Sequence, residues 1–234
     1  MANMLTAAQN LAVGLTGVRT RVAAAARRAG REAGEVTLLA VTKGHPASMI
    51  EAALALGLVD IGESYAQEGA AKQDLIHDPA VVWHFIGALQ SNKTSLVANR
   101  YAWVHTVDRI KIARRLAEQR SPHLPRLNVC LQVNLGAEAT KAGVAPDEVR
   151  ELALAVGTLD RLHLRGLMCL PPAGDDAEQS RRWFRELRQI RDDLVGTGLA
   201  LDALSMGMSG DFEVAIEEGA THVRIGTALF GPRS

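Results

Sequence analysis

Eight short apolar runs recur along the 234 residues, and each is separated from the next by a segment with helical spacing or by a connection long enough for a helix. Parallel strands need crossover connections of this kind, because the chain must return to the same end of the sheet before the next strand begins. Eight such units predict a (β/α)8 barrel, with parallel strands inside a ring of helices. The runs are Val36–Thr42, Val59–Gly62, Val82–Gly87, Ala102–Val107, Leu127–Leu135, Leu164–Leu170, Ala203–Gly207 and Thr221–Phe230.

An open, doubly wound sheet is the alternative arrangement of the same elements. That fold usually carries a GxGxxG turn after its first strand, and the sequence contains none. The barrel is therefore the favoured fold, and α/β barrels of about 200–250 residues commonly form one domain. No internal repeat, low-complexity tract or Pro/Gly/Ser-rich linker marks a boundary, so residues 1–234 are predicted to form a single domain.

The first 31 residues carry five arginines and no acidic residue, a composition that superficially suggests a transit peptide. The segment has no serine, however, and its apolar residues recur at helical spacing. An extra amphipathic helix that packs on the barrel is the better interpretation, and we expect a cytoplasmic protein. The apolar residues of this helix are Met4, Ala8, Leu11, Leu15, Val18 and Val22.

Charge and cysteine content exclude several other classes of protein. The formal net charge is zero, so the overall charge balance does not attract nucleic acid or an anionic membrane. Cys130 and Cys169 sit inside apolar runs without metal-ligand spacing, and we expect both thiols to be reduced and buried. No zinc motif, P-loop or Ser-His-Asp order appears, and His84 on a predicted strand is interpreted as a core residue.

The first chemical candidate is Lys43, which directly follows the first predicted strand. Strand alternation places it on the same side as Val41 and Leu39, at the end of the barrel where active sites lie. Desolvation there lowers the pKa of an amine and frees it to attack an aldehyde. From position alone a solvated loop lysine remains the alternative. Lys93 and Lys141 compete as reactive amines, but both follow polar loop residues.

The second candidate is the segment Leu204–Asp211, which reads LSMGMSGD before a helical run. Gly207 and Gly210 free the backbone, and Ser209 or Asp211 can cap the helix that follows. Backbone N–H groups at a strand-to-helix turn form an anion site, to which a serine hydroxyl adds a donor. A capped turn with no ligand remains the alternative.

The third candidate is VRIGTALFG, at Val223–Gly231. Alternation places Arg224 and Gly226 on one side of the predicted strand and Thr227 on the other. If Arg224 faces the barrel interior, its guanidinium needs a partner, because a buried unpaired charge costs several kcal/mol. A ligand acceptor would satisfy it, with phosphate-binding N–H groups at Gly226 and Thr227. An internal ion pair with Asp or Glu is the alternative.

Taken together, seven segments and Arg233 resemble one family, the pyridoxal phosphate homeostasis proteins. Members of that family carry a fold-type III barrel that binds pyridoxal 5′-phosphate (PLP), like the N-terminal domain of alanine racemase. The segments occur in order over nearly the whole chain: AVTKGHP (40–46), GESYAQE (62–68), WHFIGALQSNK (83–93), HTVD (105–108), QVNLGAEATKAGV (132–144), GLMCLPP (166–172), SMGMSGDFEVAIEEGATHVRIGTALFG (205–231) and Arg233.

The resemblance implies a role for each candidate residue. Lys43 corresponds to the lysine that holds PLP as a Schiff base. Ser209, Gly226 and Thr227 match the phosphate-binding positions, and Arg224 matches the residue that faces the pyridine nitrogen. An arginine there keeps that nitrogen unprotonated and weakens the ring as an electron sink.

Two positions depart from the family pattern. Most relatives have Asn where this chain has Ser64, and many have His where it has Ala88. Ser64 follows the second predicted strand, so a direct ligand contact from that position is in doubt. Neither departure touches the lysine or the two phosphate segments.

Two functions fit this site. The first is a PLP carrier in vitamin B6 homeostasis, and the second is a PLP-dependent enzyme of the amino-acid racemase type. Racemases of this fold take a tyrosine base from a second, mostly β domain, whereas this chain ends at Ser234 and neither Tyr65 nor Tyr101 has a clear role as base. We therefore expect a monomeric carrier with no catalytic residue, partnered by PLP and by PLP-dependent apo-enzymes.

Overall fold

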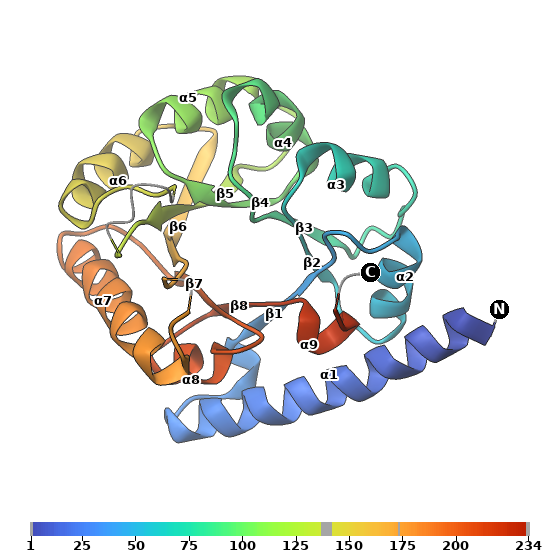
Figure 1. Ribbon diagram of the computed structural model, residues 1–234. Coiled ribbons are helices and arrows are strands. Elements are labelled where there is room, and N and C mark those ends of the chain that lie inside the picture. Colours follow the sequence, from blue (N-terminus) through green and yellow to red (C-terminus); the bar gives the residue numbers. More distant parts are fainter. Residues whose placement is uncertain (1, 137–141, 173, 233–234) are drawn as a thin grey trace.

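The computed structural model describes residues 2–136, 142–172 and 174–232. Its eight strands are all parallel, pair with their neighbours in chain order, and close when β8 pairs with β1. The predicted (β/α)8 barrel is confirmed (Figure 1). The strands are β1 (Thr37–Val41), β2 (Asp60–Glu63), β3 (Val82–Phe85), β4 (Trp103–Val107), β5 (Leu127–Val133), β6 (Leu162–Cys169), β7 (Ala203–Met208) and β8 (His222–Ile225).

Helices cover the outside of the barrel (Figure 1). They are α1 (Ala2–Arg28), α2 (Ala47–Ala55), α3 (Ala66–Gln73), α4 (Thr94–Arg100), α5 (Ile110–Gln119), α6 (Val149–Gly157), α7 (Ala177–Gly196), α8 (Phe212–Glu217) and α9 (Thr227–Phe230). Short 3-10 helices precede β1, α4 and α6, as η1 (Ala33–Glu35), η2 (Ser91–Lys93) and η3 (Pro146–Glu148).

The last strand was predicted too long. The apolar run Thr221–Phe230 divides into β8 and the one-turn helix α9. Gly226, at φ −113° and ψ −76°, takes the chain out of the extended conformation, and its carbonyl accepts hydrogen bonds from the N–H groups of Leu229 and Phe230. Alternation therefore fails beyond Ile225, and Gly226 and Thr227 line the same cavity.

The predicted amphipathic helix is confirmed as α1, which lies across the outside of α8 and α9 (Figure 1). Leu11, Leu15, Val18 and Val22 are all buried, as their spacing predicts. The side chain of Met4 lies outside the described part of the chain. The close contact with α9 matters for the site, because α9 begins directly after Gly226.

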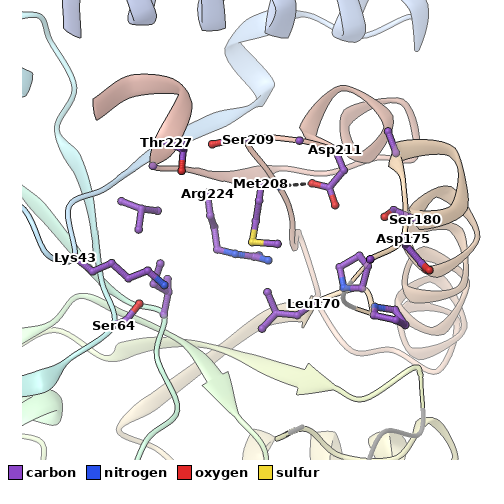
Figure 2. Close-up of a pocket in the computed structure, with 18 of the residues that line it drawn as sticks. Lys43, Ser64, Leu170, Asp175, Ser180, Met208, Ser209, Asp211, Arg224 and Thr227 are labelled. Carbon is purple, nitrogen blue, oxygen red and sulfur yellow. Dashed lines mark hydrogen bonds between the residues drawn. The ribbon is translucent and has the colours of Figure 1, made fainter. Parts of the chain in front are cut away.

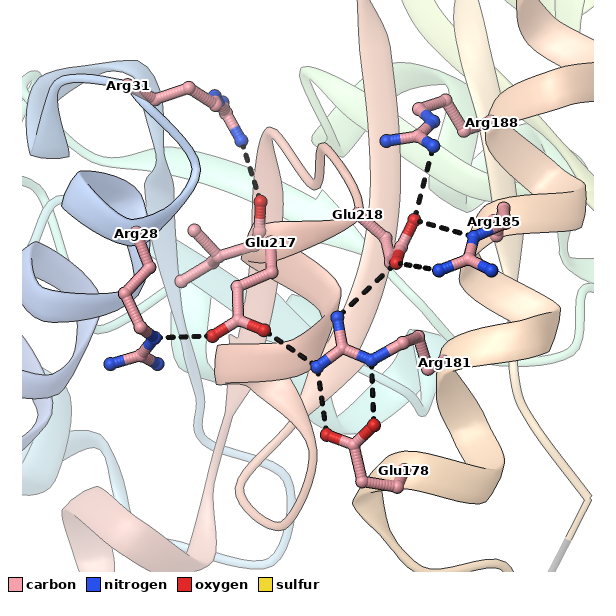
Figure 3. Close-up of polar contacts among 9 residues, drawn as sticks. Arg28, Arg31, Glu178, Arg181, Arg185, Arg188, Glu217 and Glu218 are labelled. Atoms are coloured by element: carbon pink, nitrogen blue, oxygen red, sulfur yellow. Dashed lines mark hydrogen bonds and ion pairs between the residues drawn. The ribbon is translucent and has the colours of Figure 1, made fainter.

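A network of charged side chains joins α1, α8 and α7 (Figure 3). Glu217, the last residue of α8, accepts hydrogen bonds from Arg28 of α1 and from Arg181 of α7. The neighbouring Glu218 pairs with three arginines of α7, at positions 181, 185 and 188. Through these two adjacent carboxylates, the network connects α1 to α7 across the end of α8.

No helix in the described part of the chain is long and apolar enough to cross a membrane. The same residues contain no cluster of His, Cys, Asp and Glu side chains that could hold a metal ion. Cys130 and Cys169 are free and fully buried, and burial raises the pKa of each thiol to about 12. Both are therefore protonated core residues near neutral pH.

Candidate functional site

A cavity of about 860 Å³ opens where the strands end, at the C-terminal end of the barrel (Figure 2). This is the end at which barrel enzymes place their active sites. All five residues predicted to bind the ligand line it: Lys43, Ser209, Arg224, Gly226 and Thr227. Its other walls include the apolar side chains of Val41, Ile86, Leu170, Pro171 and Met208.

Lys43 lies in a turn, two residues beyond the end of β1. Its side chain is partly buried and reaches into the cavity beside Ser64 (Figure 2). Val41 lines the same cavity, so the alternation predicted for these two residues holds past the strand end. Gly44 follows at φ +74°, a conformation that suits glycine and turns the chain toward α2.

A buried ionic cluster that sequence reasoning missed holds the backbone on both sides of Lys43. The Lys72 amine donates to the carbonyl oxygen of Thr42 at 2.7 Å and to the carboxylates of Glu63 and Glu68 at 2.6 and 2.7 Å. The backbone N–H of Gly44 donates to the same Glu68 oxygen at 2.7 Å. The i, i+4 spacing of Glu68 and Lys72 was the one available signal.

Burial dominates the electrostatics of this cluster. It raises the pKa of Glu63 despite the hydrogen bonds from Lys72 and Thr42. Burial also acts to raise the pKa of Glu68, but hydrogen bonds from Lys72 and the Gly44 N–H lower it overall. Because the Lys72 ammonium uses all three of its donors on oxygen atoms of the protein, this second amine is fixed in a structural position.

The turn after β7 brings Ser209 to the cavity. Gly207 has φ +91°, and a Cβ there would lie only 2.6 Å from the Cβ of Ala215, so the chain needs glycine at this point. Asp211, predicted as a possible helix cap, instead accepts from the Met208 N–H at 2.6 Å and closes the turn. The Ser209 hydroxyl accepts a hydrogen bond from the Ala228 N–H at 3.2 Å, which places it against the start of α9.

Arg224 points into the barrel interior and is only 4% exposed. Its Nη1 donates to the carbonyl oxygen and the hydroxyl of Ser205, at 2.7 and 2.9 Å, and its Nη2 donates to the carbonyl of Cys169 at 2.9 Å. Burial lowers its pKa, but an arginine remains charged at neutral pH. No ion pair to it occurs within the described residues, so the internal ion pair that the sequence left open is not found there.

The remaining predicted residues fall into different places. Ser64 lines the cavity, whereas Ala88 is exposed and does not. Lys93 caps α4 away from the cavity lining, and Lys141 lies outside the described residues. His84 is a buried core residue, as predicted, with hydrogen bonds to Asp60 and His105.

The site therefore combines three kinds of group around one apolar-walled space. A lysine amine can form an imine with an aldehyde. A serine hydroxyl and the backbone at Gly226–Thr227 suit a phosphate or another compact anion. A buried cation faces the space between them. A ligand that uses all three carries an aldehyde, a phosphate and a hydrogen-bond acceptor for the buried cation.

The sequence and the fold of this chain are similar to those of known proteins. Residues 15–234 match the family model described as alanine racemase, N-terminal domain. The chain is 51% identical to the pyridoxal phosphate homeostasis protein of Pseudomonas aeruginosa, over 98% of this chain and 97% of that protein. PipY of Synechococcus elongatus, solved with PLP bound, is 35% identical at a TM-score of 0.84, and the match covers 94% of this chain and all of PipY. An alanine racemase of Clostridium difficile shares the fold at 14% identity and a TM-score of 0.77, over 96% of this chain and 57% of the racemase.

Proposed function

The chain belongs to the pyridoxal phosphate homeostasis protein family, and on that basis we propose that it binds PLP as a Schiff base on Lys43 and acts in intracellular PLP homeostasis. One observation carries the proposal: Lys43, which follows the first strand, lines a single cavity together with Ser209 and Arg224, which belong to the last part of the chain. If Ser209 belonged to a capped turn without a ligand, or if Lys43 were a solvated loop lysine, these side chains would not need to line the same cavity.

The residues present fit the cofactor in size and in chemistry. The cavity volume, about 860 Å³, falls within the usual range for cofactor sites. Lys43 supplies the amine, while Ser209, Gly226 and Thr227 hold the phosphate. When bound, PLP supplies an aldehyde carbon for the amine and an aromatic ring that can withdraw electrons.

Arg224 limits what that ring can do. A guanidinium has donors only and does not give up its proton at neutral pH, so it keeps the pyridine nitrogen unprotonated as a hydrogen-bond acceptor. An unprotonated ring is a weak electron sink. Arg224 thus limits carbanion stabilisation at an amino-acid α-carbon, although racemases of this fold tolerate the same arrangement.

No tyrosine in the described part of the chain is placed as a second base for racemisation. Racemisation requires acid or base groups on both faces of the bound amino acid, within hydrogen-bond reach. Tyr65 is 59% exposed, Tyr101 is buried in the core, and neither lines the cavity. The likeness to alanine racemase at 14% identity shows the fold alone. The carrier is therefore the better-supported function, and a racemase-type enzyme is the alternative.

The same proposal extends to partners and location. A carrier in vitamin B6 homeostasis works in the cytoplasm and supplies PLP to apo-enzymes that depend on it. We propose that this chain does so as a monomer.

The test combines a spectrum with two assays. The purified protein mixed with PLP is expected to show visible absorption, and the Lys43→Arg variant, which keeps the charge but forms no Schiff base, is expected to lose it. The loaded protein is expected to activate an apo-aminotransferase and to leave a panel of L- and D-amino acids unchanged by chiral chromatography. Steady racemisation that disappears in Lys43→Arg would contradict the carrier and support the enzyme.

A further inference from the structure

A continuous row of polar side chains crosses the barrel interior beneath the cavity. Starting from Arg224, it passes through Ser205, His105 and His84 and ends at Asp60, and we call these five residues the polar relay. The four contacts that join them measure 2.9 Å from Arg224 to Ser205, 2.7 Å to His105, 3.0 Å to His84 and 3.0 Å to Asp60. The residues come from β8, β7, β4, β3 and β2.

Chemistry fixes the direction of every hydrogen bond in the relay. Burial lowers the pKa of His84 and of His105, so each ring is neutral and carries a single N–H. An ionised carboxylate can only accept, so the His84 Nε2–H donates to Asp60 and the His84 Nδ1 must accept. His105 then donates through Nε2–H, and its Nδ1 accepts from the Ser205 hydroxyl.

The consequence reaches Arg224. Because the Ser205 hydroxyl proton is used on His105, the oxygen presents a lone pair to the Nη1 of Arg224, which can only donate. Every donor in the relay therefore points away from the cavity and toward Asp60. If the relay were broken, the hydroxyl could rotate its proton toward the guanidinium.

The two ends of the relay lie in different surroundings. Arg224 lines the cavity proposed for PLP. Asp60 begins β2, at the opposite end of the barrel, and lines a second cavity of about 540 Å³ between α1 and the starts of β1 and β2. The Asp60 side chain is 27% exposed, whereas His84, His105 and Ser205 are at most 1% exposed. Because the interior members are shielded from solvent, the loss of one hydrogen-bond partner is costly and each residue depends on the next.

We propose that Asp60, His84, His105 and Ser205 are positioning residues, which fix the orientation of the Arg224 guanidinium toward the cavity. This inference rests on the proposed function for its effect on PLP, but its hydrogen-bond pattern belongs to the protein alone. A carboxylate at one end of the barrel thereby influences ligand binding at the other end.

The first test needs no PLP. Long-range ¹H–¹⁵N correlation spectra of the PLP-free protein, labelled on histidine, distinguish the two neutral tautomers. Both His84 and His105 are expected to carry the proton on Nε2 at pH 7.5. A proton on Nδ1 of either ring would overturn the relay, whatever the protein binds.

The second test is a double-mutant cycle read by the dissociation constant for PLP. Asp60→Ala and Ser205→Ala are each expected to raise it by about 3- to 10-fold, the scale of one ordinary hydrogen bond. The double variant is expected to match the single variants, because both cut the same relay. Additive effects, or an Asp60→Ala protein with unchanged affinity, would refute the proposal.

Two controls complete the cycle. Asp202→Ala removes a carboxylate that pairs with Arg165 at the same end of the barrel but is not part of the relay, and its affinity is expected to stay unchanged. Asp60→Asn keeps an acceptor for His84 and is expected to retain the wild-type tautomers. This variant therefore tests the relay even if Asp60→Ala does not fold. Failure of the wild type to bind PLP would reject the proposed function, while the tautomers would still decide the relay.

Discussion

Lys72 and Glu63 form a buried ion pair whose role is structural. The Lys72 side chain is 8% exposed and the Glu63 side chain is fully buried. Removal of one member of such a pair leaves an uncompensated charge in the interior, which is costly even where the intact pair adds little. The turn that carries Lys43 depends on both residues, because the Lys72 amine also holds the Thr42 carbonyl.

Lys72→Met is accordingly expected to lower the free energy of unfolding by about 3 kcal/mol or more. The exposed pair of Asp74 and Arg100 provides the control, and Asp74→Ala is expected to cost less than about 1 kcal/mol. Urea titration of the three proteins measures both differences. A cost for Lys72→Met as small as that of the control would show that the cluster does not hold the turn.

Ser209 provides the residue-scale prediction for the phosphate. Ser209→Ala is expected to weaken PLP binding by about 1–2 kcal/mol, the scale for one hydrogen bond to a charged group. Ser64→Ala, on the other side of the cavity, is the matched control and is expected to leave the preference for PLP over pyridoxal unchanged. Fluorescence or absorbance titration with both ligands measures this preference. Equal affinities of the wild type for PLP and pyridoxal would rule out the phosphate site.

Sequence reasoning found the residues that point into the cavity and missed those that support them. Lys43 and Arg224 were predicted because each is a charged residue in or next to an apolar run, and such a placement needs an explanation. Glu63 and Lys72 were missed because they also depend on Thr42, far away in the sequence: Lys72 donates to its carbonyl oxygen and Glu63 accepts from its hydroxyl. The polar relay was missed because its members belong to five different strands, and a single sequence does not show which ones meet across a barrel.

At the level of elements, α1 supports the phosphate segment through α9. A Cβ at Gly14 of α1 would lie 2.8 Å from the Ala228 carbonyl oxygen, whereas a Cβ at Gly17 would meet nothing within 4 Å. Gly14→Ala is therefore expected to displace α9 and weaken PLP binding, although no atom of Gly14 lies in the cavity.

Gly17→Ala is the control on the same helix, and it is expected to stabilise the protein by about 0.5–1 kcal/mol without changing PLP affinity. Thermal unfolding and PLP titration of both variants separate the two effects. Unchanged PLP affinity in Gly14→Ala would show that α1 does not control the position of α9.

The strands were predicted well because apolar runs report burial directly. Seven of the eight predicted runs overlap the observed strands to within two residues at each end. The exception is Thr221–Phe230, which has apolar residues on both sides of Gly226. Those that follow Gly226 belong to α9, which is packed against α1, so hydrophobicity alone does not separate a strand from a buried turn of helix. The backbone angles at Gly226 make that distinction.

For the whole molecule, three buried histidines contribute to the response to acid. Burial lowers the pKa of His84 and His105 and lowers that of His222 to about 4. Between pH 6.5 and 4 the unfolded chain therefore binds protons that the folded protein does not, so stability is present above pH 6.5 and falls as the pH decreases through that window.

His222→Gln is expected to reduce this loss by about 3 kcal/mol, because the proton uptake of the unfolded chain at that position disappears. His123→Gln, at an exposed site, is the control for the replacement of a histidine by glutamine. Urea unfolding at a series of pH values measures the profile. An equal slope in the wild type and in His222→Gln would contradict the assignment.

The central claim is that Lys43 is the residue that holds PLP, and borohydride reduction of the loaded protein followed by tandem mass spectrometry tests it most directly. The chain has five lysines, and Lys43 is the one that lines the cavity among those that the structure describes. The account predicts a pyridoxyl mass on Lys43, with no cleavage by trypsin after that residue. A pyridoxyl mass on Lys72, Lys93, Lys111 or Lys141 in place of Lys43 would contradict it.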